Sequence, residues 1–330
     1  MRLSVFSIAD AYPGPAEDAA ARLGEVVALG RTAERAGLSA LWVAEHHFHP
    51  GGVVPQPPVL LGALATATRT IRLGALVSVL PFHAPFEVAE QYAMVDALSG
   101  GRLNIGFGSG YIPVELEGFG LTAETKRARF DRAYETVLAA FRGEAIDAGG
   151  TPVRLNVRPV QRPHPPIWIA VQRREAIPYV ARRGVGVALI PYATVGGLEE
   201  LAEEVREYRR ALPEGVVGTV SVGLHLFAGK RLGTPRAALQ RYLDSRLAHQ
   251  SASLARRAQD DPGNARAEAI ERSGFALFGP ADDVVARLGA FTSAGVDEVL
   301  GLVDFGGLPP ATVRSSVQAL GAAWRRSSGA

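Results

Sequence analysis

The sequence predicts an α/β protein, specifically a (β/α)8 TIM barrel with insertions. Apolar runs typical of strands buried on both faces alternate with helical segments along the chain, and no change in composition divides it into halves. The length of 330 residues suits one barrel of about 250 residues plus insertions. An open doubly wound sheet is the alternative architecture.

Strands and helices are expected in regular alternation. The eight predicted strands are 2–8, 39–44, 71–80, 102–107, 167–171, 185–190, 216–228 and 298–303. The predicted helices are 17–36, 57–68, 85–99, 122–142, 198–212, 280–294 and 311–324, with a mostly helical region at 234–272. Prolines are suited to the helix starts at Pro57 and Pro85. Glycines accept the left-handed backbone that ends helices at Gly37, Gly100 and Gly295.

We expect a single domain over residues 1–330, with insertions at about 108–123, 144–166 and 230–275. The first insertion follows a glycine-rich run and is expected to be irregular up to residue 121. A hairpin turn is predicted at 147–150 in the second insertion. A polar turn at 259–264 interrupts the third insertion and is expected to be mobile.

Composition excludes several classes of protein. The chain has no cysteine, so disulfides, thiolate metal sites and cysteine nucleophiles are ruled out. The net charge is +2, and the basic residues are dispersed without stacking aromatics, which argues against nucleic-acid binding. The apolar run at the amino terminus is too short for a signal peptide, and no stretch approaches the ~20 apolar residues that span a bilayer. We expect a cytoplasmic protein without membrane or nucleic-acid partners.

The predicted site lies at the end of the second strand, where Glu45, His46 and His47 follow an apolar run. Because the carboxyl ends of barrel strands open toward ligands, these side chains fall where chemistry is expected. Neighbouring strand residues point to opposite sides, so only one histidine can face the barrel mouth. Alternation alone does not decide which. The alternative is that either histidine is a packed, hydrogen-bonded residue.

Two of the polar motifs suggest other functions. The run Gly106–Tyr111 is not a dinucleotide fingerprint, because the third glycine would fall at Tyr111 and no helix begins there. It can still let the backbone approach a flat ligand or a phosphate, or it can be a loop bent for packing. A metal cluster at histidines 46, 47, 49 and 83 has little support, because adjacent strand histidines diverge. We therefore expect no metal.

Several blocks of the sequence resemble the bacterial luciferase-like flavin monooxygenases. The likeness is carried, in the family's order, by Trp42–Phe48, Ile71–Gly74, Val79–Pro81, Asp96–Leu103, Gly118–Gly120 and Arg127. It covers the first 145 residues well and the rest loosely. Motifs within 278–306 are similar to the branch found beside polyketide and peptide synthetases, which implies secondary metabolism.

The resemblance implies a monooxygenase. In this family reduced FMN, delivered by a separate reductase, reacts with O2 to form a flavin C4a-hydroperoxide, which oxygenates a small or carrier-protein-bound substrate. His46 matches the catalytic histidine, and an imidazole with a pKa of about 6.5 can move protons near neutral pH. Glu45 would orient His46 or balance its charge. Related barrels pair through helices two and three, which implies a homodimer. The alternatives are an F420-dependent hydride-transfer oxidoreductase and a non-catalytic ligand-binding barrel.

The resemblance also assigns a cofactor site. Many members have a non-proline cis peptide against the flavin ring, and the matching bond joins Leu76 to Val77. In the phosphate site Ser109 replaces an expected arginine, and the run Val171–Arg174 replaces small hydroxyl residues. Arg173 or Arg174 could bind phosphate instead, since guanidinium suits it. The predicted cofactor-binding residues are Leu76, Val77, Ser109, Tyr111, Arg127, Val171, Gln172 and Arg173.

Overall fold

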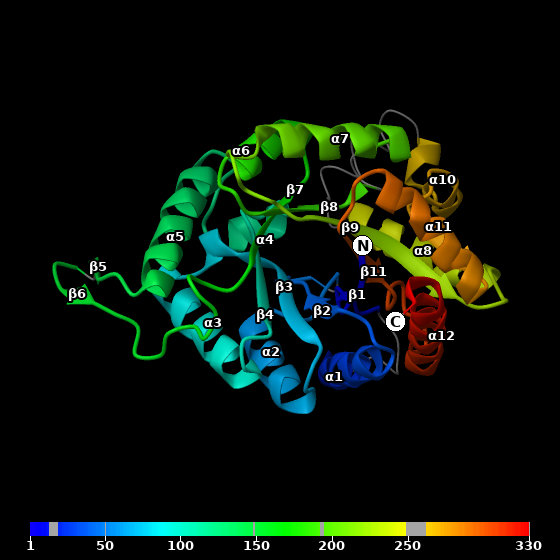
Figure 1. Cartoon of the computed structure of the whole chain (residues 1–330), viewed down its shortest axis with the longest axis horizontal. Helices are drawn as coiled ribbons and strands as arrows, with labels where there is room; N and C mark the ends of the chain where they lie inside the picture. Colours follow the sequence, from blue (N-terminus) through cyan, green and yellow to red (C-terminus); the bar gives the residue numbers. More distant parts are fainter. Residues whose placement is uncertain (13–18, 50, 148, 192–194, 249–261, 330) are drawn as a thin grey trace.

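The chain forms a closed barrel of parallel strands surrounded by helices (Figure 1). The computed structural model describes residues 1–12, 19–49, 51–147, 149–191, 195–248 and 262–329. Neighbouring strands follow the order β9–β11–β1–β2–β3–β4–β7–β8, and β8 pairs with β9 to close the ring. The predicted (β/α)8 barrel is therefore confirmed, and the open sheet is excluded.

The eight barrel strands match the eight predicted ones, with small differences at their ends. They are β1 (Arg2–Ser7), β2 (Ala40–Val43), β3 (Arg72–Val79), β4 (Leu103–Gly108), β7 (Ile167–Val171), β8 (Gly186–Leu189), β9 (Val220–Ala228) and β11 (Glu298–Leu302). A further strand, β10 (Ala276–Gly279), pairs with the end of β9 outside the ring. Sequence reasoning treated this segment only as the approach to a helix.

The helices cover the outside of the barrel. They are α1 (Ala19–Arg35), α2 (Pro57–Ala67), α3 (Pro85–Ser99), α5 (Thr125–Arg142), α6 (Ile177–Ala181), α7 (Leu198–Ala211), α8 (Gly233–Ala248), α10 (Ala267–Arg272), α11 (Ala281–Ser293) and α12 (Pro310–Ser328). The predicted helix ends at Gly37, Gly100 and Gly295 are confirmed by their left-handed backbone, with φ of 73°, 67° and 87°. Among the described residues, none of the helices has the length and apolar character needed to cross a membrane.

Large side chains fill the inside of the barrel, and glycines on neighbouring strands make room for them. The rings of Trp42 and Trp168 meet edge to face with centroids 5.0 Å apart. A Cβ atom on Gly74 would lie 2.2 Å from the Trp42 ring, and one on Gly186 would lie 2.6 Å from Trp168. Both glycines therefore allow an indole to fit in a closely packed interior, where overpacking typically costs about 1–3 kcal/mol.

The insertions add structure around the barrel. The expectation of an irregular stretch up to residue 121 is wrong, because a short helix, α4 (Pro113–Gly118), forms there. The hairpin in the second insertion is confirmed by the antiparallel strands β5 (Ile146–Asp147) and β6 (Pro152–Val153). Of the polar turn expected at 259–264, residues 259–261 lie outside the described residues, and Pro262–Ala265 forms a 3-10 turn.

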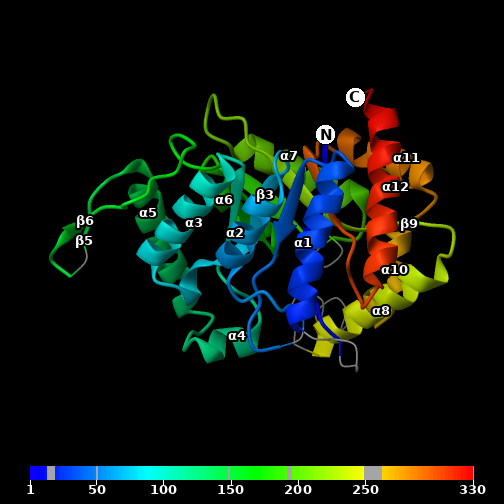
Figure 2. The same ribbon diagram turned by 90° about the horizontal axis from the view of Figure 1, so that it is seen from below.

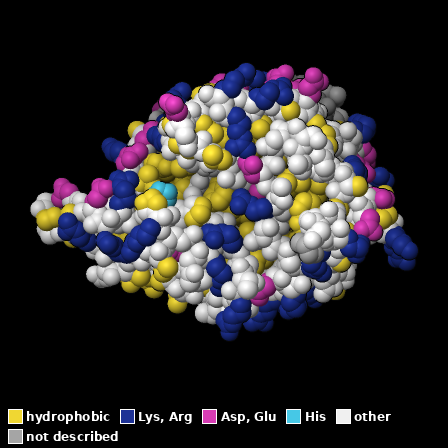
Figure 3. Space-filling view, viewed as in Figure 1, with side chains coloured by type: hydrophobic (Ala, Val, Ile, Leu, Met, Phe, Trp, Pro, Cys, Tyr) yellow, Lys and Arg dark blue, Asp and Glu magenta, His cyan; other side chains and the backbone are white. Residues whose placement is uncertain are grey.

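The first and third insertions lie at the same end of the barrel. Figure 2 shows α4 and α8 at one end and both chain termini at the opposite end. In the view of Figure 3, lysine and arginine side chains are spread among acidic and hydrophobic ones rather than gathered into one patch. The end that carries α4 and α8 is also where the parallel strands finish, so it is the end at which a ligand site is expected.

Candidate active site at the carboxyl end of the barrel

A cavity of about 770 Å³ lies at the carboxyl ends of the barrel strands. Residues from β3, β4 and β7 line it together with residues from α4, α5 and α8. Each residue predicted for the site lies in its lining: Glu45, His46, Leu76, Val77, Ser109, Tyr111, Arg127, Val171, Gln172 and Arg173. The fold therefore gathers into one cavity side chains that are up to 128 positions apart in the chain, from Glu45 to Arg173.

His46 is the histidine that faces this cavity, which answers the question that strand alternation left open. It follows β2, and its backbone N–H donates to the carbonyl of Val54 at 3.1 Å. Its Nδ1 lies 3.0 Å from Oε1 of Glu115 on α4. Its Nε2 lies 3.3 and 3.4 Å from the two terminal guanidinium nitrogens of Arg246 on α8. Both ring nitrogens are therefore held by side chains from insertions.

The surroundings of His46 keep its ring neutral at pH 7. Burial and the nearby positive charge of Arg246 lower the pKa of His46 to about 4, although the hydrogen bond with Glu115 acts in the opposite direction. In a neutral imidazole one nitrogen donates and the other accepts. Because Glu115 accepts and Arg246 donates, we assign the proton to Nδ1. Nε2 is then a proton acceptor at the cavity.

Glu115 anchors α4 to the end of β2 through one carboxylate oxygen. Its Oε1 accepts from Nδ1 of His46 at 3.0 Å, from Nε2 of His49 at 3.0 Å and from the backbone N–H of His47 at 2.9 Å. Burial alone would raise the pKa of Glu115, but these hydrogen bonds outweigh it and lower the pKa to about 2. The carboxylate is therefore ionised throughout the neutral range.

The expected contact between Glu45 and His46 is wrong. Glu45 instead accepts from Nε2 of His47 at 3.1 Å and from Nε2 of His83 at 2.8 Å. Alternation explains the difference, because residues 45 and 47 point to one side of the extended chain and residue 46 to the other. Burial would raise the pKa of Glu45, but the hydrogen bonds from His47 and His83 lower it overall.

The peptide bond between Leu76 and Val77 is cis, as the resemblance predicts. It lies where β3 passes β4, and the glycines of β4 allow the two strands to come close. A Cβ atom on Gly106 would lie 2.5 Å from the Leu76 side chain, and one on Gly108 would lie 2.5 Å from the Val77 side chain. The glycine-rich run therefore lets β4 approach β3 closely, and Leu76 and Val77 line the cavity wall.

Basic side chains gather at another part of the cavity lining, namely Lys126, Arg127 and Arg173. The guanidinium of Arg127 lies 3.4 Å from the centroid of the Tyr179 ring, and its Nε pairs with Asp131 at 3.3 Å. Burial and the charge of Arg173 lower the pKa of Lys126, whose Nζ donates to the carbonyl of Gly110 at 2.5 Å. A cavity lined by basic side chains is suited to an anion such as a phosphate.

The choice between Arg173 and Arg174, which the sequence left open, is now decided by their surroundings. Arg174 pairs with Glu203 at 3.2 Å and with Glu207 at 2.8 Å, both on α7. Arg173 lines the cavity, whereas Arg174 does not appear in the described lining. Of the two arginines, Arg173 is therefore the one that a ligand in the cavity could reach in the described lining.

Sequence reasoning missed Glu115, Arg246 and Lys126. Glu115 and Arg246 lie in insertions without a recognisable pattern, so their position depends on the tertiary fold. Lys126 could have been found, because it directly precedes Arg127, which the resemblance had already assigned to the cofactor site.

Comparison with known proteins agrees with the resemblance. Residues 1–298 match the family model described as luciferase-like monooxygenase. The chain is 31% identical to an N-acetyl-S-alkylcysteine monooxygenase of Bacillus subtilis over 218 residues, 65% of this chain and 64% of that protein. Alignments with the first curated relatives span about half to two thirds of their lengths.

Solved structures share the fold over nearly the whole chain. The monooxygenase RslO1 from Streptomyces bottropensis is 26% identical, with a TM-score of 0.80 over 99% of this chain and 100% of that one. The oxygenating component of 3,6-diketocamphane monooxygenase from Pseudomonas putida, solved with FMN, is 16% identical, with a TM-score of 0.74 over 97% of each chain. An F420-dependent tetrahydromethanopterin reductase from Methanopyrus kandleri is 15% identical, with a TM-score of 0.71 over 97% of this chain and 98% of that one. Because the family model covers nearly the whole chain, this protein belongs to the luciferase-like monooxygenase family.

Proposed function

We propose that this protein is a flavin-dependent monooxygenase that uses reduced FMN and O2 to oxygenate a small or carrier-protein-bound organic substrate. The observation that carries the proposal is His46, a neutral imidazole at the cavity with both nitrogens held in place. Reduced FMN, when bound, supplies the electrons that activate oxygen. The protein must hold the flavin, exclude water and place a group that transfers protons.

The cavity fits FMN in three respects. Its volume of about 770 Å³ lies in the range of cofactor sites. Leu76, Val77 and Val171 give it an apolar wall against which a flat ring system can pack. Lys126 and Arg173 lie in the same lining and would hold a phosphate.

The remaining side chains have defined tasks in the proposal. His46 accepts or returns a proton through Nε2, and Glu115 keeps the proton of the free ring on Nδ1. Arg246 donates toward Nε2, so its positive charge would stabilise negative charge on a ligand held beside His46. Glu45 supports the site by holding the chain after β2 to the end of β3, since its Oε2 accepts from the backbone N–H of Val79 at 3.1 Å.

The phosphate site provides the first test. The affinity of Arg173→Ala for reduced FMN should fall by about tenfold or more under anaerobic conditions, because a charge-assisted hydrogen bond contributes about 1.5–3 kcal/mol. The matched control is Arg174→Ala, which should bind reduced FMN like the wild-type protein. Riboflavin lacks the phosphate, so its affinity should not distinguish the two variants. Equal loss of FMN affinity in both variants would contradict the proposed phosphate site.

F420 is the alternative cofactor, because F420-dependent enzymes share the fold. Their identity to this chain is only 15% and 14%, so the likeness does not decide the cofactor. Separate anaerobic titrations with reduced FMN and reduced F420 would decide it. Binding of F420 alone would support hydride transfer. Binding of neither cofactor, with a small ligand still bound, would support the non-catalytic alternative.

The proposal also includes the substrate of the protein and its partners. We expect oxygen consumption to depend on a flavin reductase that supplies reduced FMN, in the cytoplasm. A substrate screen should include thioethers such as N-acetyl-S-alkylcysteines, which give the Bacillus subtilis relative its name. It should also include carrier-bound acyl and aminoacyl groups, as expected for the branch beside polyketide and peptide synthetases.

The expected homodimer would use α2 and α3. Large hydrophobic side chains are exposed on both helices, with Val59 75%, Met94 53% and Leu98 58% exposed. Such a surface is suited to association with a second copy. Sedimentation of the wild-type protein should show a dimer, and Leu98→Asp should shift it toward the monomer. A wild-type monomer at micromolar concentration would contradict this expectation.

A further inference from the structure

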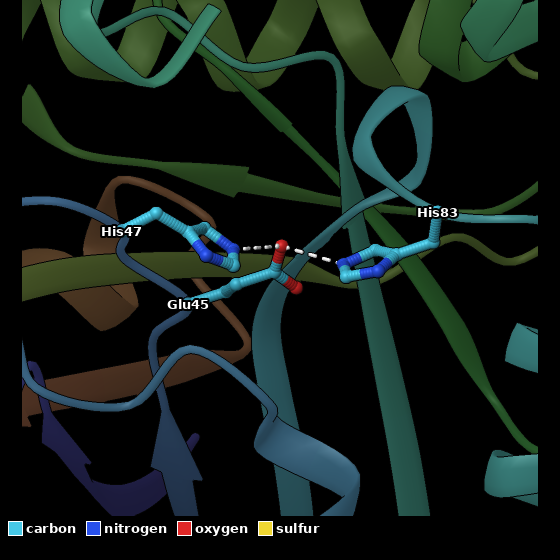
Figure 4. Close-up of side chains that lie close together, drawn as sticks. All are labelled: Glu45, His47 and His83. Carbon is cyan, nitrogen blue, oxygen red and sulfur yellow. Dashed lines mark hydrogen bonds and ion pairs between the residues drawn. The ribbon is translucent and has the colours of Figure 1, made fainter. Parts of the chain in front are cut away.

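A second group of histidines and a carboxylate lies behind the cavity wall. Glu45 stands between His47 and His83, and the Nε2 atoms of both rings point at its carboxylate (Figure 4). The three candidate ligand atoms all lie within 4.8 Å of one another. Of these three residues only Glu45 is in the described cavity lining. The group is therefore separate from the proton-transferring histidine, although it adjoins the same cavity.

The spacing of the three ligand atoms is close to that of a tetrahedral metal site. Bonds of about 2.0–2.1 Å to zinc place ligand atoms roughly 3.3 Å apart. The two Nε2 atoms lie 3.1 and 2.8 Å from Oε1 of Glu45. To bind a metal ion, the two Nε2 atoms would therefore have to move a few tenths of an ångström away from Oε1 of Glu45. Two imidazoles and one carboxylate also form a familiar donor set for zinc, with a fourth position left for water.

Contacts with the surrounding structure hold Glu45 and His47 in place. Oε2 of Glu45 accepts from the backbone N–H of Val79, which fixes the plane of the carboxylate. The ring of His47 packs edge to face against Phe119 with centroids 4.8 Å apart and against Phe82 at 5.6 Å. His83 follows a 3-10 turn over Leu80–Phe82, and its side chain keeps 14% of its surface exposed. Metal sites depend on such supporting contacts, and the exposed edge of His83 offers a route for an ion.

The group formed by His46, His49 and Glu115 has similar spacing but a different hydrogen-bond pattern. The backbone N–H of Gly51 donates to Nδ1 of His49 at 3.0 Å. Nδ1 of His49 is therefore an acceptor, and its proton is on Nε2, the atom that would have to bind the metal. No such backbone donor to Nδ1 of His47 or His83 occurs among the described hydrogen bonds. Their protons can move to Nδ1 and leave Nε2 available.

The charge of this group also favours a cation. The carboxylate of Glu45 lies between the two imidazoles, and its side chain has no exposed surface. A buried carboxylate is costly away from water unless a positive charge compensates it. A divalent ion would compensate the charge of the carboxylate and bind through the two Nε2 atoms.

We propose that Glu45, His47 and His83 form a binding site for a divalent transition metal, with Zn²⁺ as the expected ion and water as the fourth ligand. The expectation of no metal rested on the divergence of adjacent histidines. That divergence separates His46 from His47, but His83 from the end of β3 takes the place beside His47. The site does not depend on the proposed flavin chemistry.

Co²⁺ is a suitable probe, because it replaces Zn²⁺ and its four-coordinate complexes absorb strongly in the visible range. Tag-free protein should be treated with a chelator, dialysed and titrated with Co²⁺ at neutral pH. We expect one equivalent to bind with the absorption of a tetrahedral site, and Zn²⁺ to displace it. Isothermal titration with Zn²⁺ gives the affinity directly. Both measurements use protein without flavin, so failure of the flavin proposal would not affect them.

Variants of the two groups separate this site from nonspecific binding. His83→Ala should weaken Zn²⁺ binding by about 100-fold or more, because loss of even a supporting contact typically costs 10–100-fold. His49→Gln, in the other group, should retain the affinity and the Co²⁺ absorption of the wild-type protein. Circular dichroism should show that both variants are folded. Absence of tetrahedral Co²⁺ absorption in the wild-type protein, or equal affinity in wild type and His83→Ala, would overturn the proposal.

Discussion

Two histidine-carboxylate groups lie on opposite sides of the segment that follows β2. Glu115 joins His46 and His49 on the cavity side, whereas Glu45 joins His47 and His83 on the other. Both carboxylates are buried, and hydrogen bonds lower the pKa of each. The groups differ in where the carboxylate comes from. Glu115 belongs to an inserted helix, while Glu45 belongs to the same segment as His47.

The difference shows how similar residues acquire different chemistry. On the cavity side, burial and Arg246 keep His46 neutral, and Arg246 also contacts its Nε2. On the other side, His47 and His83 both direct Nε2 at the same carboxylate, which is a geometry for a cation. The first group is thus arranged to move a proton and the second to hold a charge.

The comparison predicts that removal of His46 has the largest effect on turnover. His46→Ala should lower kcat by about 10²-fold to 10⁴-fold, the usual contribution of a positioned acid or base. Oxygen consumption with a reductase, FMN and the substrate found by screening measures this change. His83→Ala should lower kcat much less, because its ring lies outside the described cavity lining. An equal loss of kcat in the two variants would contradict the proposal that the two groups have different roles.

The stability of the protein toward acid provides a second test. The pKa of His46 is about 4 in the folded protein against 6.5 for an ordinary histidine, so the unfolded chain binds more protons between these values. Stability contributed by neutral His46 is therefore present above pH 6.5 and is lost as the pH falls toward 4. The loss by pH 4.5 should be about 2–3 kcal/mol, at 1.36 kcal/mol for each pKa unit.

Urea unfolding between pH 7 and 4.5 can measure this loss as a difference between variants. Other buried groups also titrate in this range, since the pKa of His225 is lowered to about 3 and that of Glu204 is raised to about 7. Subtracting the profile of His46→Gln isolates the contribution of His46. His164→Gln, in the second insertion, is the control and should keep the wild-type slope. An unchanged slope in His46→Gln would show that the ring is not held neutral.

Replacement of Glu115 should have a smaller effect than removal of the imidazole itself. Glu115→Gln keeps a side-chain oxygen for Nδ1 of His46 but removes the negative charge, which lowers the basicity of the ring. We expect kcat to fall by about tenfold, equivalent to 1.4 kcal/mol, with little change in KM for reduced FMN. Glu117→Gln, exposed on the same helix, is the matched control. If both variants lost activity equally, the effect would belong to α4 rather than to the contact with His46.

The last prediction concerns crowding of the His46 ring by one methyl group. A Cβ atom on Gly52 would lie 2.6 Å from Cδ2 of the buried His46 ring, so Gly52→Ala must displace it. The cost in unfolding free energy should be about 1–3 kcal/mol, with a lower kcat. Gly118→Ala is the comparison variant. Its Cβ atom would lie 2.4 Å from the Phe48 ring, but that residue is 63% exposed and its ring can move, so this variant should lose less stability. Equal destabilisation of the two variants would contradict this prediction.

The sequence by itself determined the barrel and the place of its site. Apolar runs and helical periods repeat at short range, so the order of the eight strands and the position of His46 at a strand end could be predicted. The resemblance added the cis bond between Leu76 and Val77, which the structure confirms. These features depend on local patterns or on motifs that are contiguous in the chain.

Only the tertiary structure decided which partners the titratable groups have. Glu115 is 69 positions from His46 and Arg246 is 200, and neither insertion carries a pattern that indicates this contact. The incorrect pairing of Glu45 with His46 has the same origin, because adjacent residues in the chain face opposite sides of it. The carboxylate that contacts His46 belongs to Glu115, which is distant in the chain, and local sequence patterns do not predict contacts between distant residues.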